Sequence, residues 1–279
     1  MTIRDALKAA EKTLLEADVP DARLDAEYLL AGVLDAPRLL VCLSGETPLP
    51  PDHEAAFFSL IERRKTREPL QYILGTQVFM GFTFLVTPDV LIPRADTETL
   101  CEQALLYADE NRRVLDLCTG SGALAVSIKR LSPACSVTAT DISEKALAIA
   151  RENAATLEAD IEFLQGDLFS PLQGRRFDII LSNPPYIPNG ELDTLQAEVQ
   201  KEPRAALAGG TDGLDFYREI AQKAPSHLEK RGMLLLEIGD TQGDAVRALL
   251  SPKFDDIKLI HDLSGRPRVV SARLKGETA

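Results

Sequence analysis

Hydrophobic residues recur at helical spacing through the first 65 positions of the chain. The first such segment follows Thr2, which is placed to cap it, and ends before Pro20 and Asp21. The same spacing predicts further helices over residues 22–33 and 52–65, with a proline-rich loop at 48–51 before the last. This part of the chain is predicted to form a small helical bundle. The first helix places these apolar residues on one face: Ile3, Ala6, Leu7, Ala10 and Leu14.

The pattern changes at Pro69, where residues that favour strands gather around Gly75 and Gly81. A pair of short strands around a glycine turn predicts a β-hairpin, and its position predicts a connector between two domains. The strand-forming residues are Tyr72, Ile73, Val78, Phe79, Phe82, Phe84, Leu85 and Val86.

Short apolar runs alternate with helical stretches from Arg113 onward. Strands are predicted at 114–117, 137–140, 161–164, 178–181, 233–238, 257–260 and 269–272, and helices near 123–131 and 143–157. This alternation predicts a parallel sheet that helices cover on both faces. Only residues 262–268 separate the last two strands, so that pair is expected to be antiparallel.

Composition narrows the class of protein. A chain of 279 residues is long enough for a large domain with a smaller one beside it. It has no apolar run of about 18 residues and no signal-peptide pattern at its start, so a cytoplasmic protein without membrane contact is expected. The four cysteines are widely spaced and do not cluster with histidines, so neither a metal site nor a disulfide framework is expected.

The net charge of −12 argues against stable, sequence-independent binding to nucleic acid, which requires a basic surface. A local basic patch is possible at the end of the third predicted helix, formed by Arg63, Arg64, Lys65 and Arg67. We interpret these residues as a solvated helix end, where positive charge suits the helix dipole.

The segment Asp116-Leu-Cys-Thr-Gly-Ser-Gly122 ends a predicted strand and opens a helix. Glycines at 120 and 122 allow the backbone to approach a ligand, and Asp141 ends the next strand, where it can accept hydrogen bonds from a ribose diol. A dinucleotide site would favour GxGxxG spacing without a carboxylate beside the phosphates. Here the sequence is GSGALA, and Asp116 can hold the amino group of a methionine moiety, so S-adenosyl-L-methionine is the favoured cofactor. The segment 166–169 is expected to bracket the adenine, although Phe169 is equally consistent with the core.

Asn183-Pro-Pro-Tyr186 directly follows a predicted strand, on the same sheet edge as the glycine loop. The two prolines stiffen the loop. The side-chain oxygen of Asn183 and the carbonyl of Pro184 can accept both N–H bonds of a planar NH2 group and align its nitrogen with a sulfonium methyl. Tyr186 can stack on that group. A plain turn would by itself explain the sequence Asn-Pro-Pro, but it would not explain why this sequence follows a strand of a cofactor-binding sheet.

Together these motifs make the chain resemble the bacterial release factor glutamine methyltransferases, the HemK/PrmC family, over essentially its whole length. Further matching segments are 69–75, 86–94 with Thr97-Glu98, 202–207, 209–213 and 265–268. Where many members have glycine and an aromatic residue, this chain has Cys118 and Leu168, and Leu168 therefore predicts apolar packing.

The resemblance implies a seven-stranded Rossmann-like class I methyltransferase sheet with a small N-terminal helical domain joined by a β-hairpin. We assign residues 1–68 to a helical substrate-recognition domain, 69–93 to a hairpin linker and 94–279 to the methyltransferase domain. The implied substrate is the glutamine of the Gly-Gly-Gln motif of peptide chain release factors, bound by Asn183, Pro184, Pro185 and Tyr186, with Asn183 and Pro184 catalytic. The implied cofactor residues are Asp116, Cys118, Thr119, Gly120, Ser121, Gly122, Asp141, Leu168 and Asn183.

Two alternatives keep the same acceptor geometry. One is a glutamine methyltransferase of a ribosomal protein, although the segment from Arg94 to Glu98 is more similar to the release factor group. The other is a methyltransferase for amino groups of nucleic acids, which the acidic charge disfavours. A nicotinamide-dependent oxidoreductase is disfavoured by the glycine spacing, and a non-catalytic binding module would not require a polar residue at Asn183.

Overall fold

The structure is a computed structural model that describes residues 1–109 and 111–276. The chain forms two compact units. The first contains residues 1–76 together with 196–201, and the second contains the remaining described residues. The domain boundaries expected after residues 68 and 93 stay predictions. None of the helices in the described ranges has the length and apolar character that a membrane crossing requires.

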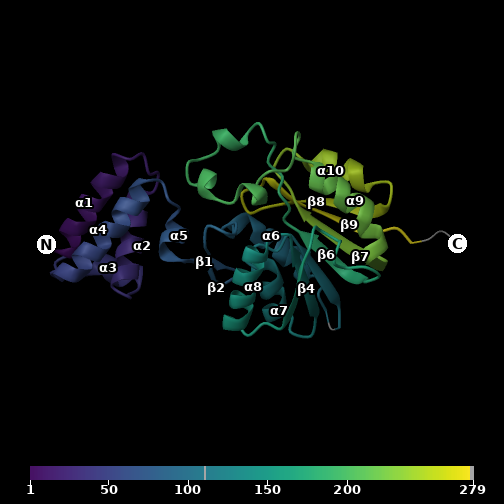
Figure 1. Cartoon of the computed structure of the whole chain (residues 1–279), viewed down its shortest axis with the longest axis horizontal. Helices are drawn as coiled ribbons and strands as arrows, with labels where there is room; N and C mark the ends of the chain where they lie inside the picture. The colour runs from purple at the N-terminus through teal and green to yellow at the C-terminus, as the bar shows by residue number, and fades with distance from the viewer. Residues whose placement is uncertain (110, 277–279) are drawn as a thin grey trace. The chain divides into compact units, whose positions relative to one another are not determined.

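The first unit is helical, as predicted (Figure 1). Thr2 caps the first helix: its hydroxyl accepts a hydrogen bond from the backbone N–H of Asp5, whose carboxylate accepts one from Thr2 in return. The apolar face predicted for that helix is buried in the core of the unit. The helices are α1 (Ile3–Leu15), α2 (Ala22–Val33), α3 (Arg38–Leu43), α4 (Pro51–Lys65) and α5 (Leu70–Leu74).

The hairpin is shorter than the sequence predicted. Its strands are β1 (Thr76–Phe79) and β2 (Phe82–Leu85), whereas Tyr72 and Ile73 lie in the short helix α5 and are wrong as strand residues. Gly75 explains the difference, because its left-handed φ of 75° ends a helical turn that begins after Pro69. Ile73 then packs into the core of the helical unit.

The interpretation of the basic group as a solvated helix end is wrong for Arg64. Its side chain is only 6% exposed and donates to Asp25 Oδ2 and to Glu198 Oε1, both at 2.7 Å. Arg67 donates to both oxygens of Glu198, also at 2.7 Å. Although burial alone would raise it, hydrogen bonds from Arg67 and Arg64 lower the pKa of Glu198 to about 2. This four-charge cluster therefore holds residues 196–201 within the helical unit.

Replacing Arg64 by methionine should lower the free energy of unfolding by about 3–5 kcal/mol, because it leaves Asp25 buried without its cation. Urea denaturation followed by circular dichroism measures the change. Arg63→Met is the matched control, since Arg63 and Glu68 form an exposed pair worth about 1 kcal/mol or less. Equal effects of the two changes would contradict a structural role for the buried cluster.

The second unit contains a seven-stranded sheet, which confirms the predicted fold class. Its strand order is β5-β4-β3-β6-β7-β9-β8, parallel except that β9 runs antiparallel to both of its neighbours. The predicted antiparallel arrangement of the last two strands is confirmed. The strands are β3 (Arg113–Leu117), β4 (Ser136–Asp141), β5 (Ile161–Gln165), β6 (Phe177–Ser182), β7 (Leu228–Glu237), β8 (Phe254–His261) and β9 (Pro267–Leu274).

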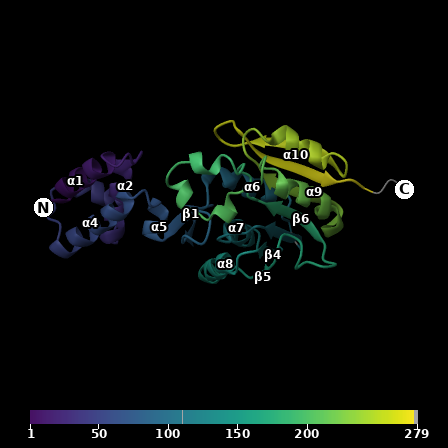
Figure 2. The same cartoon turned by 45° about the horizontal axis from the view of Figure 1, so that its top comes forward.

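Helices cover both faces of this sheet. In both views α7 and α8 lie on one side of it, and α9 and α10 lie on the other (Figures 1 and 2). In the central strands β3 and β6, alternate residues supply the two cores: Val114 and Leu181 face one, and Leu115 and Ile180 face the other. The helices are α6 (Ala95–Leu105), α7 (Ala123–Leu131), α8 (Glu144–Thr156), α9 (Asp215–His227) and α10 (Gly243–Leu250).

The sequence prediction did not include α6, α9 and α10. None of these helices has a side-chain N-cap, and α9 contains Pro225 near its end. The signals that mark where a helix begins are therefore weak in these three segments. Three short helical turns, at Leu192–Thr194, Val199–Lys201 and Arg204–Ala206, lie in the segment between β6 and α9.

Candidate functional site

A cavity of about 480 Å³ lies at the carboxyl edge of the sheet, where open α/β sheets bind ligands. Its volume is in the range of about 300–1,000 Å³ typical of small-molecule sites. Its lining includes the end of β4 and the segments that follow β3, β5 and β6. Strands β3 and β6 pair in parallel up to Leu117 and Ser182, so the glycine loop and Asn183 leave the sheet side by side.

Three left-handed residues shape the glycine loop. Cys118, Gly120 and Gly122 have φ values of 59°, 57° and 79°. A side chain at Gly122 would be strained by this conformation, and its Cβ would also press on Ala150 of α8 at 3.1 Å. Gly120 lines the cavity and has open space where a Cβ would be. The backbone can therefore approach a ligand closely at Gly120.

Asp141 connects the glycine loop with the end of β4. Its Oδ2 accepts a hydrogen bond from the backbone N–H of Gly120, and its Oδ1 accepts one from that of Ser143, both at 2.9 Å. Burial raises the pKa of Asp141, while these backbone donors lower it. An ionised carboxylate has about four acceptor positions, so each oxygen retains a lone pair for a further donor in the cavity that Asp141 lines.

Asp116 lies in strand β3, just before the glycine loop. It is fully buried, accepts a hydrogen bond from the Thr119 hydroxyl at 2.6 Å, and does not line the cavity. Burial raises the pKa of Asp116 to about 7. Burial also raises the pKa of the Cys118 thiol well above its usual range, so this cysteine stays protonated and is not a nucleophile.

The segment after β6 places Asn183 and Pro185 in the wall of the cavity. Asn183 donates from Nδ2 to the Thr97 hydroxyl at 3.2 Å. The Tyr186 carbonyl accepts a hydrogen bond from Gln242 Nε2 at 2.9 Å. Burial raises the pKa of the Tyr186 phenol to about 12. The segment is therefore held at both ends, and its tyrosine is neutral at ordinary pH.

Two glycines pack directly on the backbone of this segment. A Cβ at Gly209 would lie 2.7 Å from the Tyr186 Cα and carbonyl carbon, and one at Gly213 would lie 2.3 Å from the Tyr186 oxygen. The backbone N–H of Gly209 also donates to the Ile187 carbonyl at 2.8 Å. The glycine-rich segment 209–213 therefore supports the loop after β6 from behind.

Gly209→Ala should lower kcat for methyl transfer by about 100-fold, because its methyl group would displace the Tyr186 backbone and with it the acceptor groups. Steady-state assays with labelled cofactor measure the change. Gly190→Ala is the matched control, since a Cβ there meets nothing within 4 Å. Wild-type kcat in Gly209→Ala would show that the loop tolerates the displacement.

The segment before and within α6 connects several parts of the site. Arg94 pairs with Glu202, which also accepts from the backbone N–H of Ile92 at 3.0 Å. Asp96 pairs with Arg268 of β9 at 3.0 Å. From the sequence, residues 94–98 were recognised only as a family motif, and these contacts were not predicted. The charged residues of this segment could be seen in the sequence, but their partners could not be identified from it, because they lie over 100 positions away along the chain.

Six of the predicted site residues line the cavity, namely Cys118, Gly120, Asp141, Leu168, Asn183 and Pro185. Six do not: Asp116, Thr119, Ser121, Gly122, Pro184 and Tyr186. The functional roles of all twelve stay predictions. Phe169 is 3% exposed and stacks on His227 at 4.8 Å, so it belongs to the core and does not bracket a ligand. The sequence analysis missed the apolar wall formed by Pro203, Ala205, Ala206, Ala208 and Phe216.

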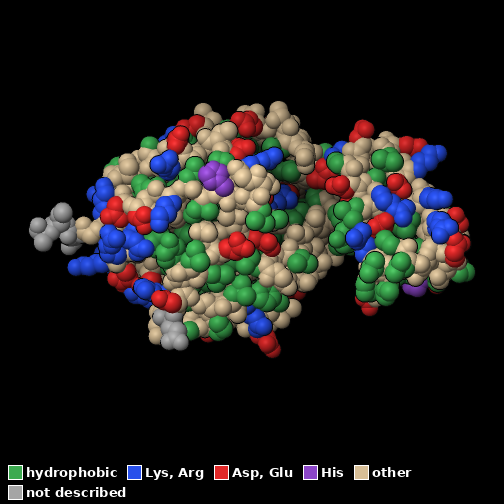
Figure 3. Space-filling model, turned by 180° about the vertical axis from the view of Figure 1, so that it is seen from behind, with side chains coloured by type: hydrophobic (Ala, Val, Ile, Leu, Met, Phe, Trp, Pro, Cys, Tyr) green, Lys and Arg blue, Asp and Glu red, His purple; other side chains and the backbone are tan. Residues whose placement is uncertain are grey.

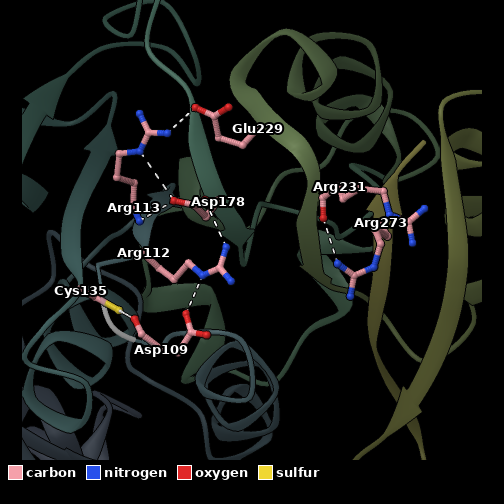
Figure 4. Close-up of polar contacts among 8 residues, drawn as sticks. All are labelled: Asp109, Arg112, Arg113, Cys135, Asp178, Glu229, Arg231 and Arg273. Carbon is pink, nitrogen blue, oxygen red and sulfur yellow. Dashed lines mark hydrogen bonds and ion pairs between the residues drawn. The ribbon is translucent and has the colours of Figure 1, made fainter. Parts of the chain in front are cut away.

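A second cavity, of about 640 Å³, lies at the opposite edge of the sheet, where the parallel strands begin. Several arginines at or near this edge have acidic partners: Arg113, which lines the cavity, pairs with Asp178 and Glu229, and the neighbouring Arg112 pairs with Asp109 at 2.6 Å (Figure 4). On the face drawn in Figure 3, basic side chains lie among acidic ones. Lys129 and Arg176, which also line this second cavity, donate to backbone carbonyls. The motifs predicted to bind ligands lie at the carboxyl edge, so the cavity there is the candidate active site.

Comparison with known proteins gives consistent matches along the chain. Residues 5–75 match the family model described as PrmC N-terminal domain, and residues 95–212 match the one described as Methyltransferase small domain. A release factor glutamine methyltransferase of Geobacter sulfurreducens is 45% identical over 275 residues, which cover 98% of this chain and 97% of that protein. A release factor glutamine methyltransferase of Moorella thermoacetica is 44% identical over 285 residues, which cover 99% of this chain and 100% of that protein.

Among solved structures, a methyltransferase from Pyrococcus furiosus is similar, with a TM-score of 0.54 at 20% identity. The similarity covers 69% of this chain and 88% of that chain. At this identity the likeness concerns the fold alone, and it agrees with the sheet described above.

Proposed function

The chain belongs to the release factor glutamine methyltransferase family, and on that basis we propose that it methylates the glutamine of the Gly-Gly-Gln motif in peptide chain release factors. The enzyme depends on S-adenosyl-L-methionine and transfers the methyl group to the side-chain amide nitrogen. The observation that carries the assignment to this site is the position of Asn183 in the wall of the cavity, next to the glycine loop.

The residues of the cavity suit S-adenosyl-L-methionine. Asp141 has free lone pairs for the ribose hydroxyls, and Gly120 allows close approach of the backbone. Leu168, Ala206 and Phe216 supply apolar surface for the adenine. When bound, the cofactor supplies a methyl group on a positively charged sulfur, which a nitrogen lone pair can attack.

Asn183 and Pro184 would orient the acceptor. An amide nitrogen is a weak nucleophile because its lone pair is delocalised. The Asn183 Oδ1 and the Pro184 carbonyl would accept its two N–H bonds, directing the lone pair toward the methyl group and stabilising the positive charge that develops on nitrogen. The support behind them, Gly209 and Gly213, would keep these oxygens in place during the reaction.

Two titratable groups near the acceptor are not assigned as general bases. The Tyr186 phenol and the Cys118 thiol both have a raised pKa through burial, so both stay protonated near neutral pH. A nitrogen that has gained a methyl group becomes acidic without assistance, and its proton would leave to water.

Mass spectrometry tests the proposal directly. The protein would be incubated with a release factor and S-adenosyl-L-methionine carrying a labelled methyl group, and the product digested and sequenced. We expect a single labelled methyl on the glutamine of the Gly-Gly-Gln motif. Parallel reactions with ribosomal subunits and with nucleic acid separate the alternatives, and label found only there would refute the proposed substrate.

We also propose that the reaction takes place in the cytoplasm, where release factors act, and that residues 1–68 contribute to recognising the release factor. Removing those residues should raise KM for the release factor more than it changes kcat. A short Gly-Gly-Gln peptide serves as the comparison substrate in the same measurement.

A further inference from the structure

The carboxamide of Asn153 connects two segments that lie far apart in the chain. Asn153 belongs to α8, which packs against the hairpin strand β2 (Figure 1). Its Oδ1 accepts a hydrogen bond from the backbone N–H of Leu85 at 2.7 Å, and its Nδ2 donates to the Leu85 carbonyl at 3.0 Å. The same Nδ2 donates to the carbonyl of Ser121 in the glycine loop at 2.9 Å. One side chain therefore holds both the end of β2 and the glycine loop.

These contacts fix the orientation of the carboxamide. An asparagine side chain has two N–H donors and one acceptor oxygen, and Asn153 uses both kinds of group. The reversed orientation would direct N–H groups at the N–H of Leu85 and an oxygen at two carbonyls. Asn153 is 2% exposed and Ser121 is 3% exposed, so loss of the side chain would leave a buried carbonyl without this partner.

The position of Asn153 in its helix also indicates a role for the side chain. Asparagine is a weak helix former in a helix interior, because its side chain competes with the backbone for hydrogen bonds. An apolar residue would suit both the helix and its core better. The other buried residues of α8 are apolar, namely Ala146, Leu147, Ala150 and Ala154.

Both segments that Asn153 holds continue into the wall of the carboxyl-edge cavity. Gly120 lines the cavity next to Ser121, and residues 89–91 line it shortly after Leu85. On the side of β4, Asp141 accepts a hydrogen bond from the backbone N–H of Gly120 at 2.9 Å. The glycine loop is therefore held by two side chains from different elements, and only Asp141 of the two lines the cavity.

We propose that Asn153 is a positioning residue of the cofactor site, which fixes the glycine loop relative to the cavity wall that follows β2. The proposal rests on the proposed function, in which this cavity binds S-adenosyl-L-methionine. A preformed wall favours binding, because the ligand does not have to order it. The coupling is reciprocal, so a cofactor bound against the glycine loop should in turn stabilise the hydrogen bonds of Leu85.

Asn153→Ala should raise the Kd for S-adenosyl-L-methionine by about tenfold, the effect of about one hydrogen bond. At saturating cofactor, kcat and the KM for the release factor should stay within about twofold of the wild-type values, because the acceptor loop after β6 is unchanged. Isothermal titration calorimetry measures the Kd, and labelled-methyl transfer measures kcat and KM.

Gln242→Ala is the matched control, because this carboxamide also holds backbone groups. Gln242 donates to the carbonyls of Tyr186 and Gly213 at 2.9 and 3.2 Å and accepts from the N–H of Gly239 at 3.0 Å. None of these four residues lines the cavity. Gln242→Ala should therefore lower kcat and leave the Kd for the cofactor unchanged. An equal rise of Kd in both variants would indicate a general loss of stability and would overturn the positioning role.

Hydrogen exchange measured by nuclear magnetic resonance tests the coupling in the wild-type protein and does not require a variant to fold. S-adenosyl-L-methionine should slow exchange of the Leu85 amide by about tenfold, although Leu85 does not line the cavity. The amides of β8, which has no residue in the cavity wall, control for general stabilisation by the ligand. Exchange at Leu85 that does not respond to the cofactor would overturn the proposal.

Comparison with Asp141→Ala separates this proposal from the proposed function. A raised Kd in Asp141→Ala with a wild-type Kd in Asn153→Ala would overturn the role of Asn153 alone. An unchanged Kd in both variants would refute the assignment of the cofactor to this cavity and with it the role of Asn153. If the wild-type protein shows the response of Leu85 to the cofactor but methylates no glutamine, the proposed substrate is wrong and the role of Asn153 is supported.

Discussion

Replacing Asn183 by alanine should lower kcat for glutamine methylation by about 100- to 1,000-fold, the usual effect of removing one preorganised polar group at a reacting centre. The carboxamide lies in the cavity wall beside the glycine loop, where its oxygen can accept an N–H bond of the substrate. The loop backbone should persist, because Gly209, Gly213 and Gln242 support it independently of this side chain. Labelled-methyl transfer to a release factor measures the rate.

Asn189→Ala is the matched control for this substitution. Asn189 is exposed in the same loop, and its hydrogen bond to the Gly210 carbonyl comes from its backbone, which alanine preserves. We expect wild-type kcat in the control and the same melting temperature in both variants. If Asn183→Ala kept the wild-type turnover number, Asn183 would not be the acceptor of the substrate amide.

The second large effect is expected at Asp141, where alanine should raise the Kd for S-adenosyl-L-methionine by about 10- to 100-fold. Hydrogen bonds to a charged group contribute about 1.5–3 kcal/mol, and the change removes those expected from the ribose hydroxyls. It also releases the backbone N–H groups of Gly120 and Ser143, which Asp141 holds at 2.9 Å. Isothermal titration calorimetry with the cofactor measures the Kd.

Asp141→Ala and Asn183→Ala should differ in how they respond to cofactor concentration. Saturating S-adenosyl-L-methionine should restore much of the rate of Asp141→Ala, because its defect lies in binding, but should not restore Asn183→Ala. Asp160→Ala is the control for removing a carboxylate, since Asp160 is exposed and lines only the cavity at the opposite edge. A Kd unchanged in Asp141→Ala would exclude the assigned contact with the ribose.

The elements with strong local patterns could be predicted from the sequence. Helix α2 was predicted with its observed bounds, and each of the seven sheet strands was placed within a few residues. The helix α6 was not predicted, because it lacks a side-chain cap and its buried face contains only Thr97, Leu100, Cys101 and Ala104. Short elements of this kind depend on the surfaces against which they pack.

In the candidate site, too, local features could be predicted from the sequence and features that depend on packing could not. The spacing of Gly120, Gly122 and Asp141 identified the cofactor loop, because a strand, a turn and a helix are local structures whose residue requirements can be recognised in one segment. The sequence did not indicate that Asp116 is buried beneath that loop. Burial depends on what covers a residue, and the covering residues come from other segments.

By itself, the sequence determined several helices of the bundle, the strands of the sheet, the glycine loop and the asparagine after β6, since each depends on residues that are neighbours in the chain. Only the tertiary structure decided that Arg64 is buried between Asp25 and Glu198, and that Asn183 meets Thr97 from 86 positions away. Hydrogen bonds act over about 3 Å, so the partner of a polar group is decided by folding and not by distance along the chain.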